Sequence, residues 1–148
     1  MAYKTITIMG DGIRKERTAN AAITPGQLIY LMSTNKVAVH ADAGGVAQRM
    51  FAVEDDLQGN EIGDAYSADN VCVYCVFRPG DEVYALIADG ENIAIGDKLV
   101  SNGDGDLKEA TLDSSGEDHV LAIALEAIDL SDSSGADPSS RRCRVEIM

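Results

Sequence analysis

The chain has 148 residues, 45% of them apolar, which is enough to bury the core of one domain. Its formal net charge of −13 removes the electrostatic attraction that drives binding to phosphates, so we expect no nucleic-acid partner. No apolar run is long enough to cross a bilayer, and the first residues lack the apolar segment of a signal peptide. We therefore expect no membrane contact and synthesis in a cytoplasm.

The predicted secondary structure is all β. No stretch keeps helical periodicity for three turns, whereas short alternating or β-branched runs bounded by Gly, Asp, Asn and Ser recur along the chain. In chain order these predicted strands cover residues 4–9, 27–32, 36–40, 49–54, 70–77, 82–88, 97–101, 107–110, 120–127 and 142–148. Their spacing and turn residues predict a small β-barrel or sandwich.

Two halves of the sequence resemble one another when they are shifted by about seventy residues. "ITPGQLIYLMSTNKV" then lies over "IAIGDKLVSNGDGDL", with Gly26 over Gly96, and two later strand-like blocks align in the same order. We therefore predict two pseudo-repeated β-units that share one domain, preceded by an extended N-terminal arm. The predicted boundaries are residues 1–17 for the arm, 18–148 for the domain, and 18–88 and 89–148 for the two units.

The basic residues concentrate at the two ends of this acidic chain. Seven of the twelve lie there: Lys4, Arg14, Lys15, Arg17, Arg141, Arg142 and Arg144. Terminal charges are often merely solvated, but two basic ends on an acidic body favour docking against an acidic partner surface. These seven residues are the predicted contacts to a partner or to sister subunits, and deletion of residues 1–17 is expected to abolish attachment while leaving a folded domain.

The stretch "SNGDGD" raises the possibility of a cation site. Asn102, Asp104 and Asp106 fit the alternating oxygen ligands of a calcium loop, but Leu107 stands where such loops need glycine and Asp113 where they need glutamate. A phosphate cradle would lead into a helix, and here the turn leads into a strand. We predict a hairpin turn, with weak calcium binding left open.

Catalytic and cofactor chemistry finds little support in the sequence. His40 and His119 lie at strand or loop ends without a nearby nucleophile motif, and the acidic run from Glu54 to Asp56 is typical of a solvated turn. Lys98 is not at a hairpin tip, where a lipoyl or biotinyl lysine would be. We expect no enzyme and no cofactor.

The three cysteines cannot form a complete set of disulfides. Cys72 and Cys75 are three apart on a predicted strand and so point to opposite faces, which disfavours metal or redox chemistry. With Cys143 they are predicted to be small buried or half-buried apolar side chains, and no metal site is expected.

Most of the chain after about residue 18 resembles the capsid decoration, or cement, proteins of tailed bacteriophages. The similar segments are a strand entry at Gly26–Ile29, an "A-x-x-I-x-x-G-D-x-L" region within Ile87–Leu99, a glycine hairpin at Ser101–Asp106, and strands at Leu121–Ala127 and Arg144–Ile147. The acidic stretch between the two units and the extension of the last hairpin depart from this pattern.

The resemblance implies a structural virion protein, made in the bacterial host cytoplasm, that binds the outer capsid surface and bridges capsomers. It implies the major capsid protein as partner and a homo-oligomer, with a trimer favoured over a dimer. The alternative is a small ligand- or carbohydrate-binding β-module that uses the acidic loops 54–64 and 102–118, although the chain has no Trp for stacking against sugars.

Overall fold

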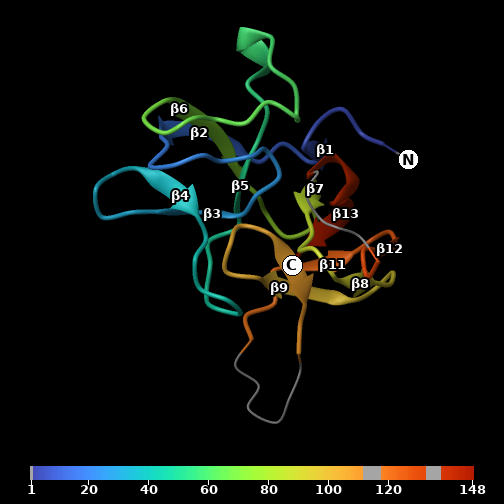
Figure 1. The fold of residues 1–148 in the computed structure, drawn as a ribbon. Helices are drawn as coiled ribbons and strands as arrows, with labels where there is room; N and C mark the ends of the chain where they lie inside the picture. Colours follow the sequence, from blue (N-terminus) through green and yellow to red (C-terminus); the bar gives the residue numbers. More distant parts are fainter. Residues whose placement is uncertain (1, 112–117, 133–137) are drawn as a thin grey trace.

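The chain folds into antiparallel sheets arranged like a sandwich, as the computed structural model shows (Figure 1). The structure describes residues 2–111, 118–132 and 138–148, and Asp113 therefore lies outside the described residues. Within these ranges there is no α-helix, and none of the sheets closes into a barrel. The predicted all-β class is confirmed, in its sandwich form. No described helix is long and apolar enough to cross a membrane.

The largest sheet has six strands in the spatial order β1-β7-β13-β11-β9-β10, and all its neighbours are antiparallel. Its strands are β1 (Thr7–Met9), β7 (Glu82–Leu86), β9 (Lys98–Ser101), β10 (Leu107–Glu109), β11 (Ala122–Ala124) and β13 (Arg142–Ile147). Strands from both predicted β-units are therefore hydrogen-bonded within one sheet.

Three smaller sheets complete the described part of the fold. They are β2-β6-β5, β3-β4 and β12-β8. Their strands are β2 (Ile13–Thr18), β3 (Ile29–Leu31), β4 (Val37–Val39), β5 (Met50–Ala52), β6 (Val71–Val76), β8 (Asn92–Ile93) and β12 (Ile128–Asp129), and two short 3₁₀ helices, η1 (Asp56–Gln58) and η2 (Pro138–Ser140), lie in connections. Each of the ten predicted strands contains an observed strand, whereas β2, β8 and β12 were not predicted.

The core is continuous between the two predicted units. Leu28 and Phe51 from the first unit and Leu99 and Leu107 from the second are fully buried in one apolar cluster. Burial of each large side chain contributes roughly 1.5–3 kcal/mol. The halves therefore stabilise each other through a shared interior, which is built mainly from aliphatic side chains.

The hairpin predicted at residues 101–106 is confirmed and packs against the first half of the chain. Asn102 N–H donates to the Asp106 carbonyl at 2.9 Å, which closes the turn between β9 and β10. Gly105 N–H donates to the His40 carbonyl at 3.1 Å, and the Gly105 carbonyl accepts from Leu28 N–H at 2.7 Å. A Cβ at Gly105 would lie 2.9 Å from that of Val39, so only glycine allows this close approach.

The two aligned turns adopt the same conformation. Gly26 and Gly96 have φ values of 98° and 92°, which glycine adopts readily. Gly26 N–H donates to the Ala52 carbonyl and Gly96 N–H to the Ala124 carbonyl, both at 2.8 Å. The division into two pseudo-repeated units stays a prediction, although these turns make equivalent hydrogen bonds.

The segment predicted as an N-terminal arm is built into two sheets. β1 pairs with β7 and β2 pairs with β6, and between the N-terminus and β1 the side chain of Ile6 is fully buried. Ile6 N–H also donates to Glu54 Oε2 at 3.0 Å. Removal of residues 1–17 would expose core side chains along β6 and β7, so the expectation that the remainder stays folded does not fit these contacts.

Candidate interaction surface

Strand β2 places three of the predicted contact residues on an exposed sheet edge. Among the described strands its only neighbour is β6, and side chains alternate between the two faces of the sheet. Arg14 lies opposite Cys75 on one face, whereas Lys15 and Arg17 lie on the other. The side chains of Ile13 to Glu16 are exposed, whereas those of Arg17 and Thr18 are partly buried.

Arg14 connects β2 to the acidic loop that contains η1. Its Nη2 atom lies 3.0 Å from Asp56 Oδ1, and both side chains are exposed. Solvent screens such a pair strongly, so it adds little stability but restrains the loop. The loop projects beyond β2 and β6 (Figure 1, green) and exposes Leu57, 84% of which is accessible.

On the opposite face, basic side chains lie beside the turn between β3 and β4. Arg17 Nη1 donates to Asn35 Oδ1 at 2.9 Å, and Lys36 Nζ lies 2.8 Å from Asp69 Oδ1. The hydrogen bond from Lys36 lowers the pKa of Asp69. Sequence reasoning missed Lys36, because only the fold brings this mid-chain residue next to Arg17.

Lys4 lies away from Arg17 and Lys36, in a hollow beside the acidic loop. The hollow has a volume of about 320 Å³, and its lining is mixed in charge: Tyr3, Lys4, Thr5, Glu54, Asp56, Asn60, Glu61 and Ile62. Lys4 is the only cation of this lining, which also contains three carboxylates. The hollow therefore favours a polar or cationic group over an anion.

The three C-terminal arginines are engaged within the fold. Arg142 is 5% exposed and its Nη2 atom donates to the carbonyls of Pro25, at 3.1 Å, and Ile62, at 2.6 Å. Arg144 Nε donates to Glu82 Oε1 at 2.6 Å. These contacts connect β13 to the first half of the chain and to the acidic loop.

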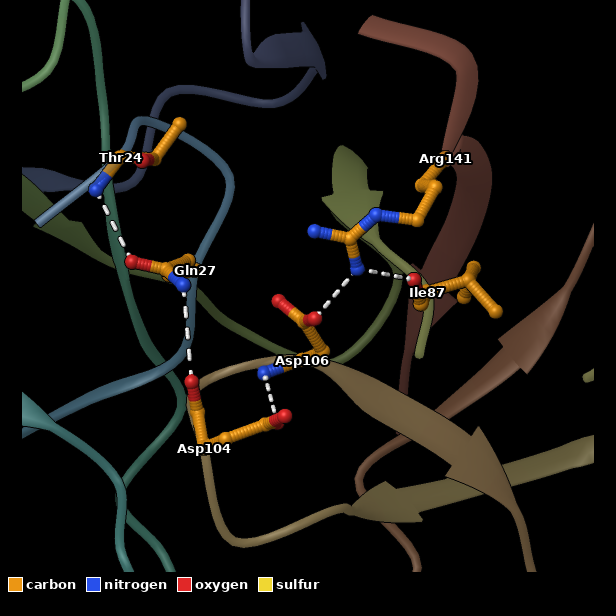
Figure 2. A network of polar contacts seen from close by, with 6 residues as sticks. All are labelled: Thr24, Gln27, Ile87, Asp104, Asp106 and Arg141. Atoms are coloured by element: carbon orange, nitrogen blue, oxygen red, sulfur yellow. Dashed lines mark hydrogen bonds and ion pairs between the residues drawn. The ribbon is translucent and has the colours of Figure 1, made fainter. Parts of the chain in front are cut away.

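Arg141 forms the most enclosed ion pair of the described residues (Figure 2). Its Nη1 atom lies 2.5 Å from Asp106 Oδ2 and also donates to the Ile87 carbonyl at 2.9 Å. Burial raises the pKa of Asp106, and the hydrogen bond from Arg141 opposes that rise. Asp106 therefore has an internal cationic partner, which removes a carboxylate from the calcium ligands considered above.

The same network reaches the turn before β3 (Figure 2). Asp106 N–H donates to Asp104 Oδ1 at 3.1 Å, and the Asp104 carbonyl accepts from Gln27 Nε2 at 3.5 Å. Gln27 Oε1 in turn accepts from Thr24 N–H at 2.9 Å. Asp104 thus joins the glycine hairpin to the first half of the chain, and Asp106 joins it to the segment before β13.

The seven predicted contact residues therefore occupy different environments. Four are on or near the N-terminal surface and three make internal contacts at β13. Their role in partner binding stays a prediction, but the internal contacts of the C-terminal arginines explain their presence structurally. The surface that the structure assembles is the β2 edge, defined here as Arg14, Lys15, Glu16 and Arg17.

The histidines do not form a catalytic or metal-binding arrangement with each other. His40 is buried; its Nδ1 lies 2.7 Å from Ser101 Oγ and its Nε2 lies 3.2 Å from the Val46 carbonyl. Ser101 is fully buried and also accepts from Gly103 N–H at 3.1 Å, so this pair joins β4 to β9 away from solvent. His119 donates its main-chain N–H to Gly44.

The cysteines are reduced and buried, as predicted. Cys72 and Cys75 lie on β6, opposite residues on different faces of β2. Burial raises the pKa of the Cys72 and Cys143 thiols to about 12, which disfavours thiolate chemistry. Across residues 2–111, 118–132 and 138–148, no three His, Cys, Asp or Glu side chains gather as a metal-binding group.

No protein-family profile matches the chain, and no curated protein matches it. A solved structure that is similar is the N base of head fiber gp8.5 in bacteriophage phi29, with a TM-score of 0.58. The match covers 93% of this chain and 95% of that chain at 14% sequence identity. At this identity the match shows a shared fold.

Proposed function

We propose that the protein is a structural component of a tailed-phage virion that binds the outer capsid surface and stabilises the shell by bridging capsomers. The observation that carries the proposal is the similarity of nearly the whole chain to the base of a phage head fiber. The sequence resemblance to decoration proteins points to the same location. A decoration protein and a fiber base both need a stable platform that holds on to a shell.

The described architecture suits attachment without catalysis. The side chains best placed for chemistry, His40, Ser101 and the cysteines, are buried in the fold. Attachment instead needs exposed, repeated contacts, and copies arranged on a symmetric shell gain affinity through multivalency. We propose the major capsid protein as the partner, a homo-oligomer as the bound form, and assembly onto the head after synthesis in the host cytoplasm.

The experiment uses purified protein and mature heads of the phage whose genome carries the coding sequence, prepared without this protein. We expect saturable co-sedimentation, ordered density at symmetric positions in cryo-electron microscopy, and heads that retain their DNA at a higher temperature. The R17E variant is expected to fold like wild type, so its affinity for heads shows whether the basic surface takes part in binding. Heads that bind no protein at micromolar concentration would contradict the proposal.

A second candidate is a small ligand-binding module, favoured by the hollow beside the acidic loop. Its volume of about 320 Å³ is close to the lower limit for ligand sites, and Tyr3 supplies one aromatic side chain. Tyr3 packs edge-on against Tyr84, with ring centroids 5.2 Å apart. Titration with simple sugars and with calcium, followed by amide shifts of Tyr3 and Glu61, tests this alternative; shifts spread evenly over the protein would exclude it.

A further inference from the structure

β2 is the longest strand at a sheet edge in the described fold. Three strands have six residues, and the other two, β6 and β13, lie between neighbours. Strand edges of this length present a row of main-chain donors and acceptors that can pair with another strand. Basic side chains commonly protect such edges, so pairing here needs a partner that matches the charges.

The register with β6 identifies which main-chain groups of β2 face outward. Just after β2, Ala19 N–H donates to the Asn70 carbonyl on the β6 side, whereas Asn20 N–H donates to Val37 on the other side. Because main-chain groups alternate along an antiparallel strand, those of the odd residues 13, 15 and 17 face β6. The main-chain groups of Arg14, Glu16 and Thr18 therefore face away from the sheet.

This alternation restricts how a second copy could pair with the edge. In a symmetric antiparallel pair, outward-facing residues must lie opposite outward-facing residues. A register centred on Arg14 would place two arginines opposite each other, and one centred on Glu16 would place two glutamates opposite each other. The register centred on Lys15 places Arg14 opposite Glu16 of the partner subunit, and does so twice.

We propose that the β2 strands of two copies pair antiparallel about a two-fold axis at Lys15, forming a continuous six-stranded sheet β5-β6-β2 with its symmetry mate. The two Arg14 to Glu16 contacts match in charge, and about four main-chain hydrogen bonds form between the outward-facing groups. Arg14 can keep its bond to Asp56, because a guanidinium has five N–H donors. The contact does not depend on capsid binding.

The same register places Lys15 opposite Lys15 of the partner subunit, which opposes pairing at low salt. The two ammonium groups are on long, flexible side chains on the other face and can diverge into solvent. Each copy also has a net charge of −13, so moderate salt should strengthen association by screening this repulsion. A two-fold contact would give a dimer, the second of the two oligomeric states expected from sequence.

Charge exchange tests the register on purified full-length protein by sedimentation velocity. R14E and E16R each turn both symmetric contacts into like-charge pairs, and each should weaken dimerisation roughly tenfold or more. The double variant R14E/E16R restores opposite charges and should recover dimers. Circular dichroism of each variant checks folding, because these exposed residues are not part of the core.

Cysteine cross-linking tests the position of the axis. K15C places two thiols in a non-hydrogen-bonded pair with Cα atoms about 4.5 Å apart, which suits a disulfide. I13C is the matched control on the same face, because its two copies would be about 13 Å apart along the strands. Rapid oxidative dimers of K15C and slow ones of I13C are expected, since the native cysteines are buried.

Each of three results would overturn the two-fold pairing. They are a monomer at all concentrations, equal cross-linking of K15C and I13C, and an oligomer unaffected by the charge exchanges. The last outcome would assign assembly to another surface. Each of these results is independent of head binding, so the proposed capsid function is tested separately.

Discussion

Arg141 and Asp106 form an ion pair in which the Nη1 and Oδ2 atoms are 2.5 Å apart and only 12% and 6% of the two side chains are exposed. The pair joins the segment before β13 to the hairpin between β9 and β10 (Figure 2). A buried pair of this kind is weak evidence for net stabilisation, because both charges lose hydration. Loss of one partner, by contrast, should destabilise the fold, because it leaves the other charge buried without a counter-charge.

R141M should lower the free energy of unfolding by about 3–5 kcal/mol, because it leaves the Asp106 carboxylate buried without its cation. Urea denaturation measures the change. The double variant R141M/D106L replaces both charges by apolar side chains and should regain much of the loss. K36M, which removes the exposed ion pair with Asp69, is the control and should change stability far less. A double variant no more stable than R141M would contradict this account.

The pH dependence of stability should differ in sign between Asp106 and Asp69. Burial raises the pKa of Asp106 above its ordinary 3.8, so its contribution to stability is complete below the unfolded-state pKa and is lost as the pH rises through the folded-state pKa. The hydrogen bond from Lys36 lowers the pKa of Asp69, whose contribution is present above the unfolded-state pKa and is lost as the pH falls through the folded-state pKa.

Urea titrations of wild type, D106N and D69N across the acidic range measure this difference. The stability of wild type relative to D106N should decrease as the pH rises, whereas that of wild type relative to D69N should increase. Two curves with the same slope would show that the Arg141 contact outweighs burial at Asp106.

Arg142 should act as a clamp between β13 and the acidic loop. R142M removes the charged donor from the carbonyls of Pro25 and Ile62 and should lower the free energy of unfolding by roughly 2–4 kcal/mol. Because Ile62 belongs to the loop, proteolysis near residues 59–64 should also become faster. R14M, which removes the exposed contact to Asp56, is the control for loop release without loss of core stability. If the loop of R142M is cleaved no faster than that of wild type, Arg142 does not hold the loop against β13.

The alternating apolar pattern was sufficient to predict most of the strands. Runs such as residues 70–77 and 82–88 became β6 and β7 because their side chains are buried, and burial is what the pattern reports. β2 was missed for the same reason. The sequence "IRKERT" has no apolar face because this strand lies at an exposed edge, so only main-chain pairing with β6 reveals it.

The candidate surface was predictable in part. Charge alone selected Arg14, Lys15 and Arg17, which the structure places on one strand. The same criterion selected Arg142, but charge cannot distinguish a solvated arginine from one that donates to buried carbonyls. Lys36 was missed because its position near Arg17 depends on the turn between β3 and β4.

A last prediction compares Gly105 in the glycine hairpin with Gly96 in the turn before β9, two glycines with similar φ angles and different surroundings. Gly96 has φ +92° with open space around it, so G96A should lower the free energy of unfolding by roughly 1–2 kcal/mol from backbone strain alone. Gly105 has φ +89°, and its added Cβ would lie 2.9 Å from Val39 Cβ on β4. G105A should therefore lower the free energy of unfolding by roughly 3–5 kcal/mol, because overpacking adds to the strain.

Thermal and urea unfolding of the two variants measure this difference in stability. Amide exchange should show faster opening at Leu28, whose N–H donates to the Gly105 carbonyl, in G105A alone. Equal losses in the two variants would mean that β4 moves aside easily and that the hairpin does not hold the two halves of the chain in register.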